Sequence, residues 1–190
     1  MITETALPSV FVIDPERHRD DRGAFFESFR ADALGRETGR PFEVRQINYS
    51  TSRRNTLRGL HGVACPPGQA KLVTCVRGEL LDVVVDLRPG SATFGAHVRN
   101  RLDARNGRAV FVPEGFGHGF LALADDTCIS YAVSTTYVPG TQIHVNALDP
   151  ALALPWGLTG SPVRSALDAG APTLLEALDA GLLTVPLEQP

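Results

Sequence analysis

Short apolar stretches recur between residue 8 and about residue 145, and Gly, Pro, Asn and Asp separate them. Many of these stretches are rich in Val, Leu and Phe, which favour β-strands. Their close and regular spacing predicts a sandwich or barrel of strands rather than alternating strands and helices. The predicted strands are Val10–Ile13, Ala24–Phe29, Phe42–Asn48, Thr56–His61, Ala70–Arg77, Glu79–Leu87, Ala96–Leu102, Arg108–Pro113, Gly119–Leu123 and Cys128–Val133.

Signals for helices are few. The segment Arg30–Thr38 is followed by Gly39, which predicts a short helix with a glycine stop. The segment Pro172–Ala180 begins with proline, carries apolar residues at 174, 175 and 178, and is followed by Gly181. We expect the C-terminal helical segment, about residues 165–185, to pack on the outside of a barrel.

The tripeptide Arg77-Gly78-Glu79 separates two long predicted strands and is typical of a hairpin turn. The chain contains no internal repeat and no low-complexity linker that would divide it. We therefore expect one all-β domain over residues 1–190, with a few short peripheral helices.

Composition narrows the class of protein. Of the 190 residues, 43% are hydrophobic and 21% are charged, as in ordinary soluble domains, and the net charge of −3 argues against a nucleic-acid or membrane partner. The start of the chain lacks the pattern of a secretory signal, and the three cysteines lack CxxC spacing, so we expect a cytoplasmic protein with reduced thiols.

Lys71 is the only lysine among 18 basic residues. One interpretation is chance in an arginine-biased chain. The other is a site that requires a compact ammonium group, which a guanidinium cannot replace.

The segment from Gly107 to His118 has the spacing G-x5-P-x-G-x2-H and resembles the second half-motif of cupins. In that arrangement a strand ends at a Pro-Gly turn, and the next begins with a histidine directed into the barrel mouth, where jelly rolls hold ligands. A metal cupin also needs two histidines one residue apart and then a carboxylate, but Val63 lies two places after His61. Two histidines without a third ligand rarely hold a catalytic metal, so we expect none.

Both histidines are then either hydrogen-bonded structural residues or parts of an organic acid–base site. Other polar residues gather in the same segments, which favours the second interpretation. Five segments carry this pattern: Asp21-Arg22-Gly23-Ala-Phe-Phe-Glu27-Ser-Phe, Gln46-Ile-Asn48-Tyr-Ser50, Thr56-Leu-Arg58-Gly-Leu-His61, Gly68-Gln-Ala-Lys71-Leu-Val and Val112-Pro-Glu-Gly-Phe-Gly-His118-Gly-Phe.

In this order the segments closely resemble the dTDP-4-dehydrorhamnose 3,5-epimerase family, over about residues 8–185. The resemblance implies a cupin jelly roll, usually homodimeric, that needs no metal or redox cofactor and acts on dTDP-linked 4-keto-6-deoxyhexoses. Relatives from antibiotic-sugar pathways epimerise only C3 or only C5. The segment Pro66-Pro67-Gly68-Gln-Ala-Lys71 and the ending Ala180-Gly-Leu-Leu look more like those relatives.

Epimerisation beside a ketone needs a base, a group that stabilises the enolate oxygen, and an acid. An imidazole accepts a proton near neutral pH, so His61 is the candidate base, and by the resemblance Asp168 orients its ring. The ammonium of Lys71 would stabilise the enolate, and Tyr131 matches the family's proton donor. The structural alternatives are a capping carboxylate at Asp168, a solvated lysine at Lys71 and a core tyrosine at Tyr131.

Substrate-binding candidates follow from the same segments. Arg22 and Glu27 match family positions that bind the nucleotide and its diphosphate. Gln46 and Asn48 supply neutral hydrogen bonds to sugar or thymine edges. Arg58 either forms a surface salt bridge or binds the sugar ketone or a diphosphate oxygen.

Two further residues are candidates for substrate binding, and each has two possible interpretations. Tyr137 either stacks on a base or sugar or belongs to the core. His118 is expected to bind substrate or to support His61, rather than to act as the base.

Three positions depart from the rhamnose enzyme: Gly62 follows His61 in place of a large residue, Leu167 precedes Asp168 in place of a basic one, and Thr136 replaces one of two tyrosines. These changes leave open whether C3, C5 or both are epimerised.

The competing hypotheses are a non-catalytic sugar-binding cupin and a metal-dependent cupin oxygenase or isomerase. The missing metal ligands disfavour the latter.

Overall fold

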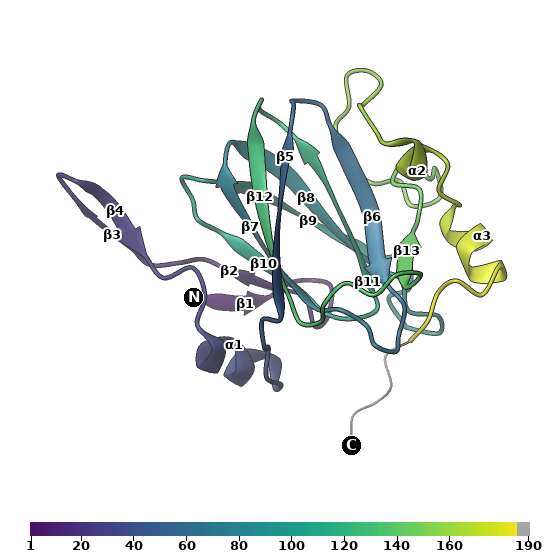
Figure 1. Cartoon of the computed structure of the whole chain (residues 1–190), viewed down its shortest axis with the longest axis horizontal. Coiled ribbons are helices and arrows are strands. Elements are labelled where there is room, and N and C mark those ends of the chain that lie inside the picture. Colours follow the sequence, from purple (N-terminus) through teal and green to yellow (C-terminus); the bar gives the residue numbers. More distant parts are fainter. Residues whose placement is uncertain (186–190) are drawn as a thin grey trace.

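The computed structural model describes residues 1–185, and eleven of its thirteen strands form two antiparallel sheets packed face to face (Figure 1). The six-stranded sheet has the spatial order β1 (Ile2–Glu4), β2 (Phe11–Ile13), β10 (Ala109–Val112), β7 (Lys71–Arg77), β12 (Thr127–Val133) and β5 (Gln46–Ser52). The five-stranded sheet has the order β13 (Gln142–His144), β6 (Leu57–Val63), β11 (Phe116–Ala122), β8 (Glu79–Asp86) and β9 (His97–Asp103).

Successive strands mostly alternate between the two sheets. From β5 to β8, and again from β9 to β13, the chain crosses from one sheet to the other at each step. This crossing pattern is that of a jelly roll. The prediction of an all-β cupin barrel with a few short peripheral helices is confirmed.

The predicted hairpin at Arg77-Gly78-Glu79 is wrong. Strands β7 and β8 belong to different sheets and do not pair. Gly78 has a φ of 78°, and a Cβ there would lie 2.6 Å from Thr127 Oγ1, so the residue forms a tight corner between the sheets. A sharp turn between two apolar strands fits both a hairpin and such a corner. The local sequence does not distinguish them, because contacts with distant strands decide which sheet each strand joins.

One hydrophobic core lies between the sheets. Val73 and Ile129 of the six-stranded sheet meet Val84, Phe116 and Phe120 of the five-stranded sheet, and all five are buried. The polar candidates His118 and Tyr131 belong to strands that also line this space. The core therefore holds the two walls of the barrel at a fixed separation.

Two further layers cover the outer faces of the sheets. The chain after β13, which includes α2 (Ala166–Ala169) and α3 (Leu174–Asp179), packs Trp156 and Leu174 with Leu57 and Val83 of the five-stranded sheet. A capping box begins α3.

On the other side, α1 (Ala31–Thr38) ends at Gly39, whose φ is 73°, and it buries Leu34 against the outer face of the six-stranded sheet. Because both sheets are covered on both sides, their central strands contain nearly continuous apolar runs.

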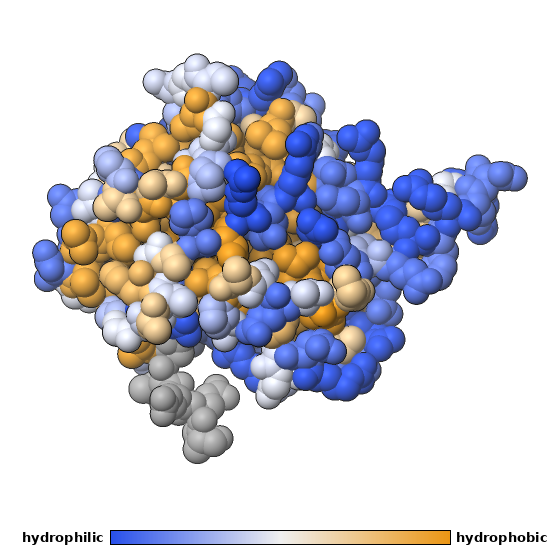
Figure 2. Space-filling model, turned by 180° about the vertical axis from the view of Figure 1, so that it is seen from behind, coloured by the Kyte–Doolittle hydropathy of each residue, from blue (hydrophilic) through white to orange (hydrophobic). Residues whose placement is uncertain are grey.

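Strands β3 (Arg17–Asp20) and β4 (Gly23–Phe26) form a separate two-stranded arm. Figure 1 shows the arm projecting away from the barrel on the side opposite α2 and α3. In Figure 2 the arm is predominantly hydrophilic, whereas apolar residues gather over the body of the barrel. Phe25 is nevertheless 75% exposed on it.

Several strand predictions need correction. The sequence missed β1, β3 and β13, which are short or polar. The strand predicted at Phe42–Asn48 is β5 at Gln46–Ser52, because Phe42 packs with α1 and the inward positions of β5 are polar. The strand predicted at Ala24–Phe29 ends at Phe26, and the one predicted at Gly119–Leu123 begins at Phe116.

Within residues 1–185, no helix has the length and hydrophobicity needed to cross a lipid bilayer. The three cysteines, Cys65, Cys75 and Cys128, are unpaired, as expected.

A close backbone contact fixes how β6 approaches β11. Gly59 has a φ of 111°, and a Cβ there would lie 2.7 Å from both the Cα of Gly119 and the carbonyl oxygen of His118. The register of the two strands shifts at this point, between His118 and Phe120. The contact sets the position of His61 two residues along β6.

We expect Gly59→Ala to destabilise the protein by about 3 kcal/mol or more, because it adds a backbone clash to an unfavourable φ. Gly90→Ala is the matched control, since Gly90 has a φ of 79° but no heavy atom within 4 Å of its ideal Cβ position. The control should cost about 1 kcal/mol. Urea unfolding measures both, and equal losses would contradict the role of the contact.

Candidate active site

Three imidazoles lie in a row on the inner face of the five-stranded sheet. His144 of β13 is paired in register with His61 of β6, and His61 is paired with His118 of β11. Directly paired residues of an antiparallel sheet project from the same face. The strand register, rather than sequence proximity, therefore brings these side chains together.

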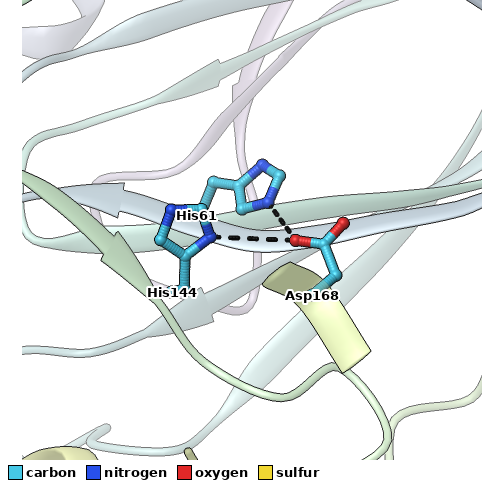
Figure 3. A group of neighbouring side chains, drawn as sticks. All are labelled: His61, His144 and Asp168. Atoms are coloured by element: carbon cyan, nitrogen blue, oxygen red, sulfur yellow. Dashed lines mark hydrogen bonds and ion pairs between the residues drawn. The ribbon is translucent and has the colours of Figure 1, made fainter. Parts of the chain in front are cut away.

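His61 forms a hydrogen bond with Asp168 of α2. Its Nε2 lies 2.6 Å from Asp168 Oδ1, and the imidazole is 36% exposed whereas the carboxylate is 5% exposed (Figure 3). Burial acts to raise the pKa of Asp168, but the hydrogen bond and charge of His61, with Ser165 and the backbone of Gly59, hold it below its ordinary value. Asp168 is therefore an ionised acceptor of the Nε2–H of His61, and in the neutral form of that ring Nδ1 carries the lone pair.

A second His–Asp pair lies deeper in the barrel. His118 Nε2 is 2.5 Å from Asp82 Oδ2, and both side chains are buried. His118 contacts neither Asp168 nor the ring of His61 through a hydrogen bond within the described residues. His118 was expected to support His61, and the contact that the structure gives them is their pairing on neighbouring strands β11 and β6.

Tyr131 lies on the facing sheet. Its ring is in edge-to-face contact with His118 at 6.0 Å between centroids, and its hydroxyl is 3.2 Å from Ser50 Oγ. Burial raises the pKa of Tyr131 to about 12, although Ser50 and the charge of Arg58 oppose this rise. The phenol is therefore protonated at neutral pH and lies across the lumen from the histidine row.

Lys71 begins β7 on the same sheet as Tyr131. Its Nζ donates a hydrogen bond of 3.2 Å to the carbonyl oxygen of His61, which brings the ammonium beside the row. Lys71 is buried, and burial lowers its pKa to about 8. The interpretation of a solvated strand lysine is wrong.

The other binding candidates divide into two groups. Arg58 donates to Ser52 Oγ and the Thr51 carbonyl oxygen, and Gln46 donates to Asn48 Oδ1, so these residues lie on β6 and β5 near Tyr131. Tyr137 is 61% exposed and not part of the core, and its backbone N–H donates to Gln46 Oε1.

Arg22 and Glu27 are not part of this group. Both lie on or beside the projecting arm, where Arg22 is exposed and paired with Asp20. Glu27 lines a cavity of about 550 Å³ at the base of the arm, and none of the other candidate residues lines that cavity. Figure 1 shows the β3–β4 arm projecting away from β6, β11 and β13, the strands that carry the three histidines.

The sequence missed three polar residues of the site. Asp82 interrupts the apolar run Leu80-Leu81-Asp82-Val83, and a charge inside a buried strand is a usable signal. Ser50 lies in a segment already singled out, but nothing indicated its contact with Tyr131. His144 belongs to the three-residue strand β13, for which the sequence gives no periodic signal.

His144 also bears on the prediction that the site holds no metal. That prediction relied on the lack of a third donor, whereas His61, His144 and Asp168 have donor atoms within 4.8 Å of one another. Ligand atoms around a tetrahedral zinc ion are separated by roughly 3.3 Å. Here His61 Nε2 and Asp168 Oδ1 are 2.6 Å apart and share a hydrogen bond, so they are closer together than two zinc ligands would be. The lack of a metal stays a prediction.

Chemically, the arrangement offers a base with an orienting carboxylate, a buried ammonium and a protonated phenol on facing walls. Such a set can remove a carbon-bound proton, stabilise the resulting oxyanion and return a proton from another direction.

Comparison with known proteins identifies relatives of this chain. Residues 4–176 match the sequence model of a family described as dTDP-4-dehydrorhamnose 3,5-epimerase. The chain is 48% identical to a dTDP-4-dehydrorhamnose 3-epimerase from Streptomyces niveus, over 93% of this chain and 85% of the relative. It is 42% identical to a dTDP-4-dehydrorhamnose 3,5-epimerase from Mycobacterium tuberculosis, over 95% and 90%.

A solved structure is similar along nearly the whole chain. NovW, a 4-keto-6-deoxy sugar epimerase from the novobiocin biosynthetic gene cluster of Streptomyces spheroides, aligns with a TM-score of 0.94 and 46% identity. The alignment covers 97% of this chain and 92% of NovW.

The single lysine allows a direct test of the environment at Lys71. With ¹³C-lysine labelling, we expect one side-chain ε signal that titrates near pH 8 in the folded protein, because burial disfavours the ammonium. In urea the midpoint should return towards the ordinary value of 10.5. A folded-state midpoint above 10 would contradict the buried position.

Proposed function

This chain belongs to the dTDP-4-dehydrorhamnose 3,5-epimerase family, and from this premise we propose that it inverts C3 of a dTDP-4-keto-6-deoxyhexose by proton transfer beside the C4 ketone. The protein is an isomerase of the nucleotide-sugar epimerase type. The observation that carries the proposed mechanism is the position of the His61–Asp168 pair opposite Tyr131 and beside Lys71.

In the first step, Nδ1 of His61 takes the proton from the carbon next to the ketone. The electron pair of the broken C–H bond forms the enolate, and its negative charge develops on the C4 oxygen. Asp168 stabilises the imidazolium through the bond to Nε2, as in other His–Asp pairs. The ammonium of Lys71 stabilises the oxyanion, where charge appears only during the reaction.

In the second step, the hydroxyl of Tyr131 gives its proton to the opposite face of the same carbon. The enolate pair forms the new C–H bond, and the ketone is restored. The phenolate that remains is a strong base, since the pKa of Tyr131 is about 12, and it regains a proton from water. The imidazolium of His61 releases its proton to solvent, which completes the cycle.

The choice of C3 rests on the relatives. Both the Streptomyces niveus and the Mycobacterium tuberculosis enzymes are named for position 3, whereas position 5 appears in only one of these names. Of the three departures, Gly62 faces Ile143 and Leu87 in the outer core, and Leu167 is exposed beside Asp168. We propose that such neighbouring changes act on the site indirectly, and that C5 is the position on which this chain can differ from the dual epimerases.

Arg58, Gln46, Asn48, His118 and Tyr137 are proposed to hold the substrate. Arg58, Gln46 and Asn48 have polar groups on β5 and β6 close to Tyr131. Tyr137 is exposed beside Gln46, where it is available to stack on a base or sugar. No metal or redox cofactor enters the proposed steps.

We also propose a homodimer, in which the β3–β4 arm of one protomer reaches the barrel mouth of its partner. This would bring Arg22 and Glu27 to a nucleotide from the second subunit, although they lie away from the histidine row of their own chain. Strand β5 is a sheet edge and exposes Ile47 and Tyr49, which supports a protein contact there. The unpaired thiols fit a reducing, cytoplasmic location.

Incubation with dTDP-4-dehydro-6-deoxyglucose in heavy water tests the reaction. We expect deuterium at C3 with inversion, detected by NMR and mass spectrometry. His61→Ala should lower exchange by about 10³-fold, since it removes the base. Tyr131→Phe should retain exchange from the His61 side and lose inversion.

His97→Ala on β9, at the opposite edge of the sheet, is the control and should leave exchange unchanged. Folded wild-type protein that incorporates no deuterium at C3 or C5 would refute the function and favour a sugar-binding cupin. Undiminished exchange in His61→Ala would remove His61 as the base.

The dimer predicts a sedimentation mass of twice the chain mass of 20.4 kDa. Tyr49→Asp should weaken association, because it introduces a charge at the exposed edge of β5. Leu175→Asp on α3 is a matched control, since Leu175 is similarly exposed on the other side of the barrel. A monomeric wild type would contradict this proposal.

A further inference from the structure

His144 contacts both members of the His61–Asp168 pair, and the proposed reaction steps do not use it. It lies on β13, directly opposite His61 in register, and the two rings meet edge to face with 4.8 Å between centroids. The imidazole of His144 is less exposed than that of His61, at 23% against 36%. The side chain therefore forms part of the wall behind the proposed base.

The two imidazoles are directed at one carboxylate oxygen. Asp168 Oδ1 lies 2.6 Å from His61 Nε2 and 3.7 Å from His144 Nδ1, and Figure 3 shows both nitrogens facing it. The Nδ1 of His144 is buried and has no hydrogen-bond partner within the described residues. A buried, unpaired nitrogen is unfavourable, so a small movement that shortens the longer distance would be stabilising.

The charges around His144 keep its ring neutral. Burial lowers the pKa of His144, the charge of His61 and that of Lys71 lower it further, and Asp168 opposes them. The guanidinium of Arg164, which donates to Asn146 Oδ1 and the carbonyl oxygen of Asp168, faces the same region. A neutral ring with its N–H towards Asp168 does not repel the imidazolium that forms on His61.

We propose that His144 is a positioning residue that shares the Asp168 carboxylate with His61 and so limits how strongly this carboxylate holds a proton on His61. This inference depends on the proposed role of His61 as the base. A base held too firmly in its protonated form would be inactive at neutral pH. The dipole of a neutral N–H that faces Oδ1 from 3.7 Å offsets part of the negative charge that favours the imidazolium.

The test compares His144→Phe with His144→Asn. Phenylalanine keeps a ring against His61 but removes the nitrogen, so Asp168 acts on His61 alone. We expect the acidic limb of the kcat/KM profile to move to higher pH by about half a unit to one unit. Asparagine retains a neutral N–H donor at the same distance from the backbone as Nδ1, and it should return the limb towards the wild-type position.

A second measurement does not depend on activity. In substrate-free protein, NMR titration of the His61 imidazole should move its midpoint upward by the same amount in His144→Phe and not in His97→Phe. A wild type that is inactive on the dTDP-ketosugar refutes the proposed function, while this titration still decides the coupling of His144 to His61.

A role for His144 in packing alone predicts a different result. Both His144 variants would then lower kcat and thermal stability without moving either the acidic limb or the His61 midpoint. That outcome, or a shift of equal size in His144→Asn and His144→Phe, would overturn the inference.

Discussion

The hydrogen bond between His61 and Asp168 joins two residues 107 positions apart and is the contact on which the arrangement of the site depends. A buried carboxylate is unfavourable unless donors surround it, and Asp168 meets this requirement only when α2 lies against β6. The packing of Leu174 and Ala177 on the five-stranded sheet holds the C-terminal segment in that position. Apolar burial outside the barrel thus determines the orientation of an imidazole inside it.

Burial in the lumen shifts the pKa values of Tyr131 and Lys71, the two reactive groups on the six-stranded sheet, in opposite directions. Burial makes the phenol of Tyr131 hold its proton more firmly and makes the ammonium of Lys71 hold its proton less firmly. Both groups remain protonated at neutral pH, so the wall carries a neutral donor and a single positive charge. Such a wall is complementary to an enolate, in which negative charge develops on an oxygen while a neighbouring carbon awaits a proton.

Sequence patterns predicted best where burial is two-sided. Strands β8 and β10 contain long apolar runs because layers cover both faces of their sheets, and both were located to within one or two residues. Strand β5 was displaced because its inward residues Gln46, Asn48 and Ser50 are polar and face the lumen. A strand that lines a binding site therefore has the opposite pattern from a strand that lines a core.

The sequence by itself determined the all-β class and the family resemblance, and that resemblance indicated His61, Lys71, Tyr131 and Asp168 as the candidate reactive residues. These depend on residue type and on short spacings, such as Arg58-Gly-Leu-His61, which can be read locally. Only the tertiary structure decided that Gly78 turns a corner between sheets, that Arg22 and Glu27 lie on a separate arm, and that His144 and Asp82 join the histidine row. Those facts depend on strand register and sheet membership, which are fixed by contacts between distant segments. Of these residues only Asp82, a charge inside an apolar run, leaves a local trace in the sequence.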